Sequence, residues 1–214
     1  MLRPLSPLEA RVLGVLVEKQ STVPDSYPMS LNALVGGCNQ KTARLPVIET
    51  TEAEVLNALE SLKGLSLVFE GSGSRVVKFE HNAGRVLQVP SQAVAVLAVL
   101  MLRGPQTSAE LRLNCERLHR FADVSSVEGF LDELAAKATP MAVKLPRAAG
   151  EREARWAHLL SGEVVLPASR EAVGEGHVSS DEMAALRTEQ TRLAAELMEL
   201  KALVHRLAGE LGVT

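Results

Sequence analysis

The sequence has few aromatic residues and few cysteines. Aromatic residues make up 3% of its 214 residues, so its cores must be packed mainly from Leu, Val and Ala, which favours helices. Two cysteines, Cys38 and Cys115, are too few for a disulfide framework and lack the spacing of a metal site. We expect both thiols to be reduced and buried, as small apolar residues in a reducing cytoplasm.

The sequence also lacks a strong charge excess and a long apolar run. Its formal net charge of −3 argues against a protein that coats nucleic acid over its whole surface. The first residues do not form a signal peptide, and the longest apolar run, 93–102, is too short to cross a membrane. We therefore expect a cytoplasmic protein without a membrane partner.

Motifs for catalysis are missing too. The five histidines have no metal-ligand spacing, and the glycine-rich segment 71–74 lacks the lysine and the helix of a phosphate loop. No serine or cysteine lies in a nucleophile motif. The sequence thus predicts a protein that is not an enzyme and that has no cofactor and no metal.

Residues 51–80 carry the pattern around which the rest is organised. Apolar residues at helical spacing predict a helix that begins after Thr51 and ends at Gly64. Two short apolar runs, 65–69 and 75–79, flank the segment Gly-Ser-Gly-Ser and predict a β-hairpin. A helix followed by such a hairpin is typical of the second half of a winged helix-turn-helix.

The preceding residues supply the first half of this motif. Ser6 and Pro7 predict the start of a helix over 8–19, and Ser30 predicts the start of a helix over 31–40. The following segment, 39–50, is too long for a tight turn between helices. We expect a functional surface in this connection.

The pattern then repeats, because residues 95–100 echo 11–16 and residues 127–134 echo 55–62. The sequence therefore predicts a mainly α fold with small β wings, an α+β class, with winged-helix domains at 1–88 and 89–162. The other elements expected in the second domain are a helix over 108–118, a third helix with Ser125 and Glu128 as its capping box, and wing strands at 141–145 and 155–159.

The last part of the chain differs from both domains. Residues 163–178 read as a linker, and 179–214 as a long helix with a heptad seam that one polar residue, Gln190, interrupts. The seam predicts a coiled coil and hence a homodimer; the alternative is a helix that packs on its own domains. The seam residues are Met183, Leu186, Leu193, Leu197, Leu200, Val204, Leu207 and Leu211.

Charge is distributed unfavourably for DNA binding through the third helices. Their predicted exposed faces carry Glu54 and Glu60 in the first domain, and Asp132 and Glu133 in the second. Carboxylates repel phosphates, whose contacts supply most of the affinity for DNA. The candidate residues for contact with nucleic acid or a partner lie elsewhere: Gln40, Lys41, Arg44, Arg75, Arg147 and Arg152.

Two functions follow from these patterns. The first is a DNA-binding, regulator-like protein, which the winged-helix fold favours. The alternative is a protein-interaction adaptor, like the tandem winged helices of chromosome-organising complexes, and the charge pattern favours this one. The possible partners are thus DNA or another protein.

The chain resembles the YceH-like family, bacterial proteins of unassigned function with two tandem winged-helix domains. The resemblance implies the fold and implies no activity. The family pattern CNQKTNRDPV or CNQKTNREPV differs from this chain at Ala43 and Leu45, where the family has Asn and an acid. The matching stretches are LEARVLGVLVEKQ (8–20), YPMSLN (27–32), CNQKTARLPV (38–47), SRVVKFE (74–80), LRGPQTSAELR (102–112) and GEREARWAHLLSGE (150–163).

Overall fold

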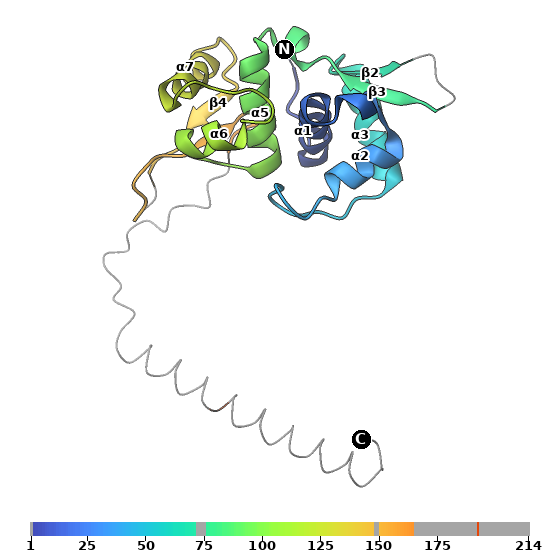
Figure 1. Cartoon of the computed structure of the whole chain (residues 1–214), viewed down its shortest axis with the longest axis horizontal. Coiled ribbons are helices and arrows are strands. Elements are labelled where there is room, and N and C mark those ends of the chain that lie inside the picture. Colours follow the sequence, from blue (N-terminus) through green and yellow to red (C-terminus); the bar gives the residue numbers. More distant parts are fainter. Residues whose placement is uncertain (1, 72–75, 148–149, 165–191, 193–214) are drawn as a thin grey trace. The chain divides into compact units, whose positions relative to one another are not determined.

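The computed structural model describes residues 2–71, 76–147, 150–164 and 192 (Figure 1). Residues 1–165 form one compact unit, and we describe that unit alone. It is a mixed α+β structure in which helices predominate and the sheets are small and antiparallel. None of the helices in the described ranges is long and apolar enough to cross a membrane.

The N-terminal half contains three helices and a three-stranded sheet. The sheet order is β1-β3-β2, and Met29 and Glu70 both pair with Phe79 of the middle strand. The elements are α1 (Pro7–Thr22), a short 3-10 turn (Pro24–Ser26), β1 (Met29–Ser30), α2 (Leu31–Cys38), α3 (Glu52–Gly64), β2 (Val68–Gly71) and β3 (Lys78–His81).

Local signals set the helix starts as predicted. Ser6 and Glu9 form a capping box at α1, and Thr51 and Glu54 form one at α3. The Ser30 hydroxyl accepts from the amide of Ala33 at the start of α2. These caps are confirmed because each depends on residues within one turn of the helix.

The predicted hairpin strands were placed two to three residues too early. After Gly64 the chain makes one further turn, in which the Leu67 amide donates to the Leu62 carbonyl at 3.0 Å. Ser66 has a positive φ of 59°, so the extended conformation begins only at Val68. The predicted turn at 71–74 falls largely outside the described residues.

From α5 (Ser91–Arg103) onward the C-terminal half repeats this order of elements, and the short helix α4 (Ala83–Leu87) connects the two halves. The main-chain groups of Gln106 pair with those of Trp156 at 3.0 and 2.7 Å, so Gln106 takes the place beside the hairpin that β1 has in the N-terminal half. The elements are α4 (Ala83–Leu87), α5 (Ser91–Arg103), α6 (Ser108–Asn114), α7 (Val124–Ala135), β4 (Ala142–Lys144) and β5 (Trp156–His158).

Two predictions for this half were wrong in detail. Asp123, not Ser125, caps the third helix, since its carboxylate accepts from the Ser126 amide at 2.7 Å. The second helix ends at Asn114 instead of extending to Leu118, and Thr107 with Glu110 forms its capping box. Both wing strands are confirmed within one or two residues.

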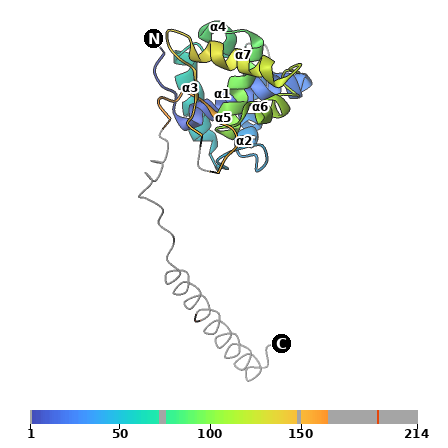
Figure 2. The ribbon, with the colours of Figure 1, turned by 90° about the vertical axis from the view of Figure 1, so that its left-hand side faces the viewer.

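Figure 2 shows α4 near α7, where Lys137 donates to the Gln88 carbonyl at 3.1 Å.

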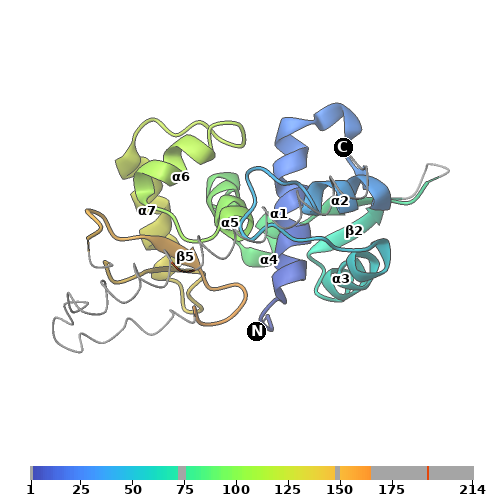
Figure 3. The same ribbon diagram turned by 90° about the horizontal axis from the view of Figure 1, so that it is seen from below.

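The two halves share one apolar core, with α1 and α5 side by side in Figures 1 and 3. Gly14 allows this approach, because a Cβ there would lie 3.0 Å from the Leu102 side chain. Every residue of α5 from Ala93 to Leu102 is buried, as expected for a helix covered on all sides.

Both cysteines are free and buried, which confirms the prediction. Cys38 ends α2, and Cys115 directly follows α6. Burial raises the pKa of the Cys38 thiol to about 11 and that of Cys115 to about 12. Both thiols therefore stay protonated and unreactive near neutral pH.

Candidate functional site

The connection between α2 and α3, predicted to be a functional surface, is a tightly held loop. The Asn39 side chain closes it, since its Nδ2 donates to the Thr50 carbonyl and its Oδ1 accepts from the Thr50 amide, both at 2.8 Å. The Leu45 amide donates to the Leu102 carbonyl of α5, also at 2.8 Å. The loop is thus attached to both halves.

Arg44 anchors this loop from inside. Its guanidinium pairs with both carboxylate oxygens of Glu18 on α1, at 2.6 and 3.1 Å, and its Nε donates to the Gly37 carbonyl. The side chain is 0% exposed. Sequence reasoning assigned Arg44 to a contact surface; the structure places it in the interior, so we omit it from that surface.

Arg44 and Glu18 also hold the side chains of Gln40 and Lys19 in place. The Gln40 Oε1 accepts from Arg44 at 2.9 Å and from Lys19 at 3.2 Å. Burial by itself would raise the pKa of Glu18, but the hydrogen bonds from Arg44 and Lys19 lower it overall. Glu18 is therefore a carboxylate that neutralises Arg44 at pH 7.

Arg11, on α1, is a second buried arginine, which was not singled out from the sequence. Its Nη1 and Nη2 donate to the carbonyls of Cys38 and Pro46 at 3.2 and 2.6 Å. A signal was available, because Arg11 corresponds to Ala95 in the repeated pattern, where the second copy has a small apolar residue. Burial first, and then the charge of Arg44, lower the pKa of Arg11.

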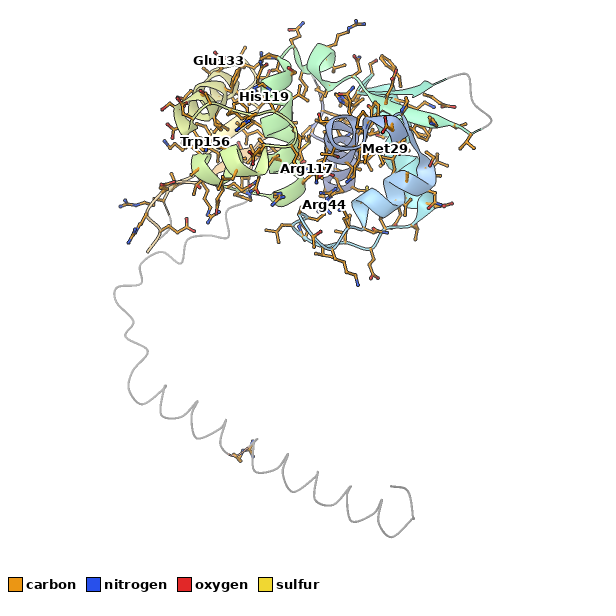
Figure 4. The ribbon with its side chains drawn as sticks, in the orientation of Figure 1. Met29, Arg44, Arg117, His119, Glu133 and Trp156 are labelled. Atoms are coloured by element: carbon orange, nitrogen blue, oxygen red, sulfur yellow. The ribbon has the colours of Figure 1, made fainter. Side chains whose placement is uncertain are left out.

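The remaining predicted contact residues belong to different loops of the chain. Lys41 is exposed on the connection, and Arg147 and Arg152 are exposed between β4 and β5. Arg75 lies outside the described residues. Figure 4 labels Arg44 on the connection after α2 and Arg117 on the loop after α6. Of the predicted contact residues, Lys41, Arg147 and Arg152 are thus the cations exposed in the described part of the chain.

The outward face of α3 is acidic, as predicted. Glu52, Glu54 and Glu60 are exposed together with Asn57. Lys63, the basic residue of this helix, donates to Glu60 at 3.0 Å and to Glu70 of β2 at 2.6 Å. The hydrogen bond to Glu70, followed by that to Glu60, raises the pKa of Lys63. Its charge is thus already neutralised.

An apolar residue lies within this acidic face. Leu56 is 41% exposed and lies four residues, about one helical turn, from both Glu52 and Glu60. At the inner edge of α3, Ser61 accepts a hydrogen bond from Arg3, which also pairs with Glu9 at 2.7 Å. The hydrogen bond that Arg3 donates to the Glu9 carboxylate is the main reason why the pKa of Glu9 is lowered to about 2.

The matching helix of the second half is acidic as well. Asp132 and Glu133 of α7 are exposed, and Figure 4 labels Glu133 on its outer side. Cations gather instead on the loop after α6, where Arg117 and Arg120 are exposed. Arg155 is held by Glu110 at 2.9 Å and by Glu151 at 3.1 Å.

No group of three His, Cys, Asp or Glu side chains that could hold a metal ion is present in the described part of the chain. A cavity of about 410 Å³ does lie between residues 45–50 and the end of α5. Its lining includes six polar side chains: Arg11, Glu49, Thr50, Glu54, His158 and Ser161. Burial lowers the pKa of His158 to about 4, so its imidazole is neutral at pH 7.

The predicted coiled-coil seam lies outside the described residues, so pairing through it stays a prediction. Its members are Met183, Leu186, Leu193, Leu197, Leu200, Val204, Leu207 and Leu211.

Comparison with known proteins supplies a family and no activity. Residues 5–151 match a family described as "Protein of unknown function, DUF480". The chain is 64% identical to a UPF0502 protein of Burkholderia lata over 214 residues, 99% of this chain and 91% of that protein. It is also 64% identical to one from Leptothrix cholodnii over 219 residues, covering 100% and 98%. A third, from Cupriavidus necator, is 62% identical over 216 residues, covering 99% and 89%.

Proposed function

We propose, for a chain that belongs to the DUF480 family of proteins of unknown function, a role as a protein-binding module without catalytic activity. In this proposal residues 1–88 and 89–162 are two winged-helix units, and the first unit binds its partner through the outward face of α3. The proposal agrees with the resemblance to the YceH-like family, whose members have no assigned activity.

The order of the elements supports the winged-helix assignment. In each half a helix leads to a short β pairing, then to two helices and a hairpin of two strands. In each half a residue just before the second helix pairs with the last strand. Ser30, which directly precedes α2, pairs with β3, and Gln106, two residues before the start of α6, pairs with β5. This is the arrangement in which a third helix is presented outward.

A single observation favours protein over DNA as the partner of the first unit. The helix that would enter the major groove presents exposed carboxylates, and its lysine is already paired with Glu60 and Glu70. Phosphate contacts need free cations, because they supply most of the affinity for DNA. The same face suits a protein surface that offers basic side chains around an apolar contact for Leu56.

A crosslinking experiment in cells tests this assignment. A photo-crosslinking amino acid replaces Leu56 in the full chain, and the control replaces Leu113 of α6, which is 66% exposed. We expect a discrete protein adduct from position 56 that disappears when Glu52→Lys and Glu60→Lys are added. Adducts that form equally from both positions, or that persist after the charge reversal, would contradict a specific partner on this face.

DNA binding by a regulator-like protein is the second candidate, and exposed cations outside the third helices favour it. Lys41, Arg147 and Arg152 are exposed, and so are Arg117 and Arg120. Few cations per unit predict weak binding with a shallow dependence on salt. A DNA titration at two salt concentrations compares the wild type with a Lys41→Ala, Arg147→Ala, Arg152→Ala variant.

Salt-sensitive DNA binding that weakens in this triple variant would favour the DNA candidate. The absence of binding at low salt, together with a partner crosslinked through position 56, would favour the protein candidate. The two results therefore separate the two functions.

The proposal also includes a homodimer formed by the coiled-coil seam and a cytoplasmic location. Support for the location is that Cys38 and Cys115 are free thiols, as is usual in a reducing compartment. Sedimentation of the full chain, and of a chain that ends near Gly176, tests the dimer. If both chains sediment as monomers at tens of micromolar, roughly the range of ordinary protein association, the dimer would be contradicted.

A further inference from the structure

The cavity beside the connection has an apolar lining that continues onto exposed apolar residues. Its volume of about 410 Å³ falls within the range of binding cavities, about 300–1,000 Å³. Leu45, on the lining, is 62% exposed, and Val47 beside the lining is 52% exposed. Large exposed apolar side chains next to an apolar cavity indicate an interaction site. The apolar lining also includes Pro7, Leu8, Ala10, Pro46, Ile48, Leu100 and Met101.

The exposed charges on the cavity lining are negative. Arg11, Glu49 and Glu54 are the residues of this lining that carry a charge at pH 7. Arg11 is 3% exposed, and its Nη1 and Nη2 donate to main-chain carbonyls. Glu49 and Glu54 are both exposed. A molecule that approaches the cavity from solvent therefore meets two carboxylates, while the arginine is turned to the main chain.

Both carboxylates are available to a cation. Glu49 makes no hydrogen bond or ion pair with any of the described residues. Glu54 accepts from the Thr51 amide and hydroxyl at 2.8 Å and from the Thr50 hydroxyl at 3.1 Å, always through Oε2. Its Oε1 thus remains open to a donor from another molecule. The hydrogen bond from the Thr51 amide is the largest cause that lowers the pKa of Glu54, so the group is charged at pH 7.

The cavity borders the acidic face of α3. Glu54 belongs to that helix and also to the cavity lining, and Glu52 and Glu60 are exposed on the same helix. A protein bound over the outward face of α3 would therefore also reach the cavity. Such a partner would meet an apolar hollow and carboxylates side by side.

This distribution of charge decides which part of a partner enters the cavity. Apolar walls and the buried cation of Arg11 disfavour a second cation inside, whereas they suit an apolar side chain. The exposed carboxylates favour a lysine or arginine that stays close to solvent. Side chains that fill a pocket in this way supply a large share of the binding energy at protein interfaces.

We propose that the cavity receives an apolar anchor side chain of a protein partner, and that a lysine or arginine of the same partner segment pairs with Glu49 or Glu54. This inference rests on the proposed function, because it names the segment of the partner that binds beside the face of α3.

Crosslinking from the edge of the cavity tests the site in cells. A photo-crosslinking amino acid replaces Val47 in the full chain, and the control replaces Glu133, which is exposed on α7. We expect position 47 to capture the same protein as position 56 and position 133 to capture none. Mass spectrometry of the crosslinked peptide should find an apolar residue with a lysine or arginine close to it in sequence.

The crosslinks separate this inference from the proposed function. An adduct from position 56 without one from position 47 would overturn the cavity site and leave the face of α3 as the binding surface. A captured segment without lysine or arginine would overturn the proposed chemistry of the partner. No adduct from either position would contradict the proposed function itself, and the inference with it.

Defined peptides measure the same preference in solution. The full chain, labelled with ¹⁵N, is titrated with Gly-Lys-Leu-Leu-Lys-Gly, with the acidic analogue Gly-Glu-Leu-Leu-Glu-Gly and with the polar analogue Gly-Lys-Ser-Ser-Lys-Gly. We expect the first peptide to shift the amide resonances of Val47, Ile48 and Thr50 in a saturable manner. Its affinity should be about tenfold or more above that of either analogue.

Two pairs of exposed variants locate the peptide. Glu49→Gln should weaken binding of the basic peptide about two- to fivefold, while Glu133→Gln should leave it unchanged. Leu45→Ser should weaken it about threefold or more, because apolar contact is lost, and Leu113→Ser should not. All four residues are solvent-accessible, and thermal unfolding checks that each variant remains folded.

Three results of the titrations would overturn the proposal. One is the absence of saturable shifts up to about 5 mM of the basic peptide, where affinity is negligible. Another is equal affinity for the basic and the acidic peptide, which would mean that the carboxylates are not recognised. The third is binding that neither Glu49→Gln nor Leu45→Ser weakens, which would place the peptide elsewhere on the chain.

Discussion

Between the second and the third helix, the N-terminal half has the connection 39–51 and the C-terminal half has 115–123. The first is attached by polar anchors, namely Arg44 with Glu18 and Arg11 with two carbonyls. The second is attached by aromatic packing around a buried ring, Phe121.

This difference shows how one order of elements is maintained by two kinds of interaction. Aromatic packing around Phe121 needs no partner of opposite charge, and it is joined there by Arg112, whose Nη2 donates to the Ala122 carbonyl at 3.2 Å and whose buried Nε has no hydrogen-bond partner among the described residues. Buried arginines need a counter-charge, and the carboxylate of Glu18 on α1 pairs with Arg44 and not with Arg11. The half with polar anchors is therefore the half that keeps an unneutralised cation beside a cavity.

The largest effect is expected from breaking the aromatic connection. The Phe121 ring lies 4.7 Å from His119 and 5.8 Å from Phe130, measured between ring centroids. Phe121→Ala should lower the free energy of unfolding by about 3–5 kcal/mol, because it leaves a cavity in the core. Urea denaturation measures this loss. Leu113→Ala, on an exposed side chain of the same half, is the control and should change stability by less than about 0.5 kcal/mol.

Breaking the polar connection should cost nearly as much. Glu18→Gln keeps the shape of the side chain but leaves Arg44 as a buried cation without a counter-charge. We expect a loss of about 3 kcal/mol in the free energy of unfolding. Glu151→Gln, which breaks the exposed pair with Arg155, should cost less than about 1 kcal/mol. Equal losses in the two variants would mean that the buried pair is not an anchor.

A pH series sharpens the comparison, because each half ends its last strand with a half-buried histidine. Burial lowers the pKa of both His81 and His158 to about 4, below the ordinary value of 6.5. Between pH 6.5 and pH 4 the unfolded chain therefore binds more protons than the folded chain. The contribution of these histidines to the free energy of unfolding is complete above pH 6.5 and is lost as the pH falls toward 4.

Each histidine should account for a loss of about 1–2 kcal/mol between pH 7 and pH 5. His158→Gln should remove its share of this pH dependence, and so should His81→Gln. An unchanged slope in either variant, measured by urea denaturation at both pH values, would show that the histidine is not buried in its neutral form.

The smallest expected effect is a gain in stability on the first connection. Ala43 has a positive φ of 58°, a conformation that costs a residue with a Cβ roughly 1 kcal/mol. Ala43→Gly should therefore raise the free energy of unfolding by about 0.5–1 kcal/mol. Ala53→Gly, at an ordinary position of α3, should lower it by a similar amount. Thermal unfolding of both variants tests the opposite signs.

The Asn of the YceH-like pattern fits this interpretation, since Asn tolerates a positive φ better than Ala does. Ala43→Asn should therefore also be stabilising. A loss of stability in both Ala43 variants would contradict the strained backbone.

Much of the local structure follows from the sequence alone. The caps at Ser6 and Thr51, the helix end at Gly64 and the strands near 141–145 and 155–159 depend on residues close together in the chain. The acidic faces of the third helices could be predicted for the same reason, because helical spacing assigns each residue to a side.

The tertiary structure alone decided which charged residues are free. Lys41 and Arg44 are three residues apart and looked equivalent, yet Lys41 is exposed and Arg44 is buried. The difference arises because Glu18, 26 positions earlier in the chain, meets Arg44 across the packing of α1 on the connection. Burial and ion pairing depend on such distant partners, which composition and spacing do not contain, and so does the cavity that Arg11 lines.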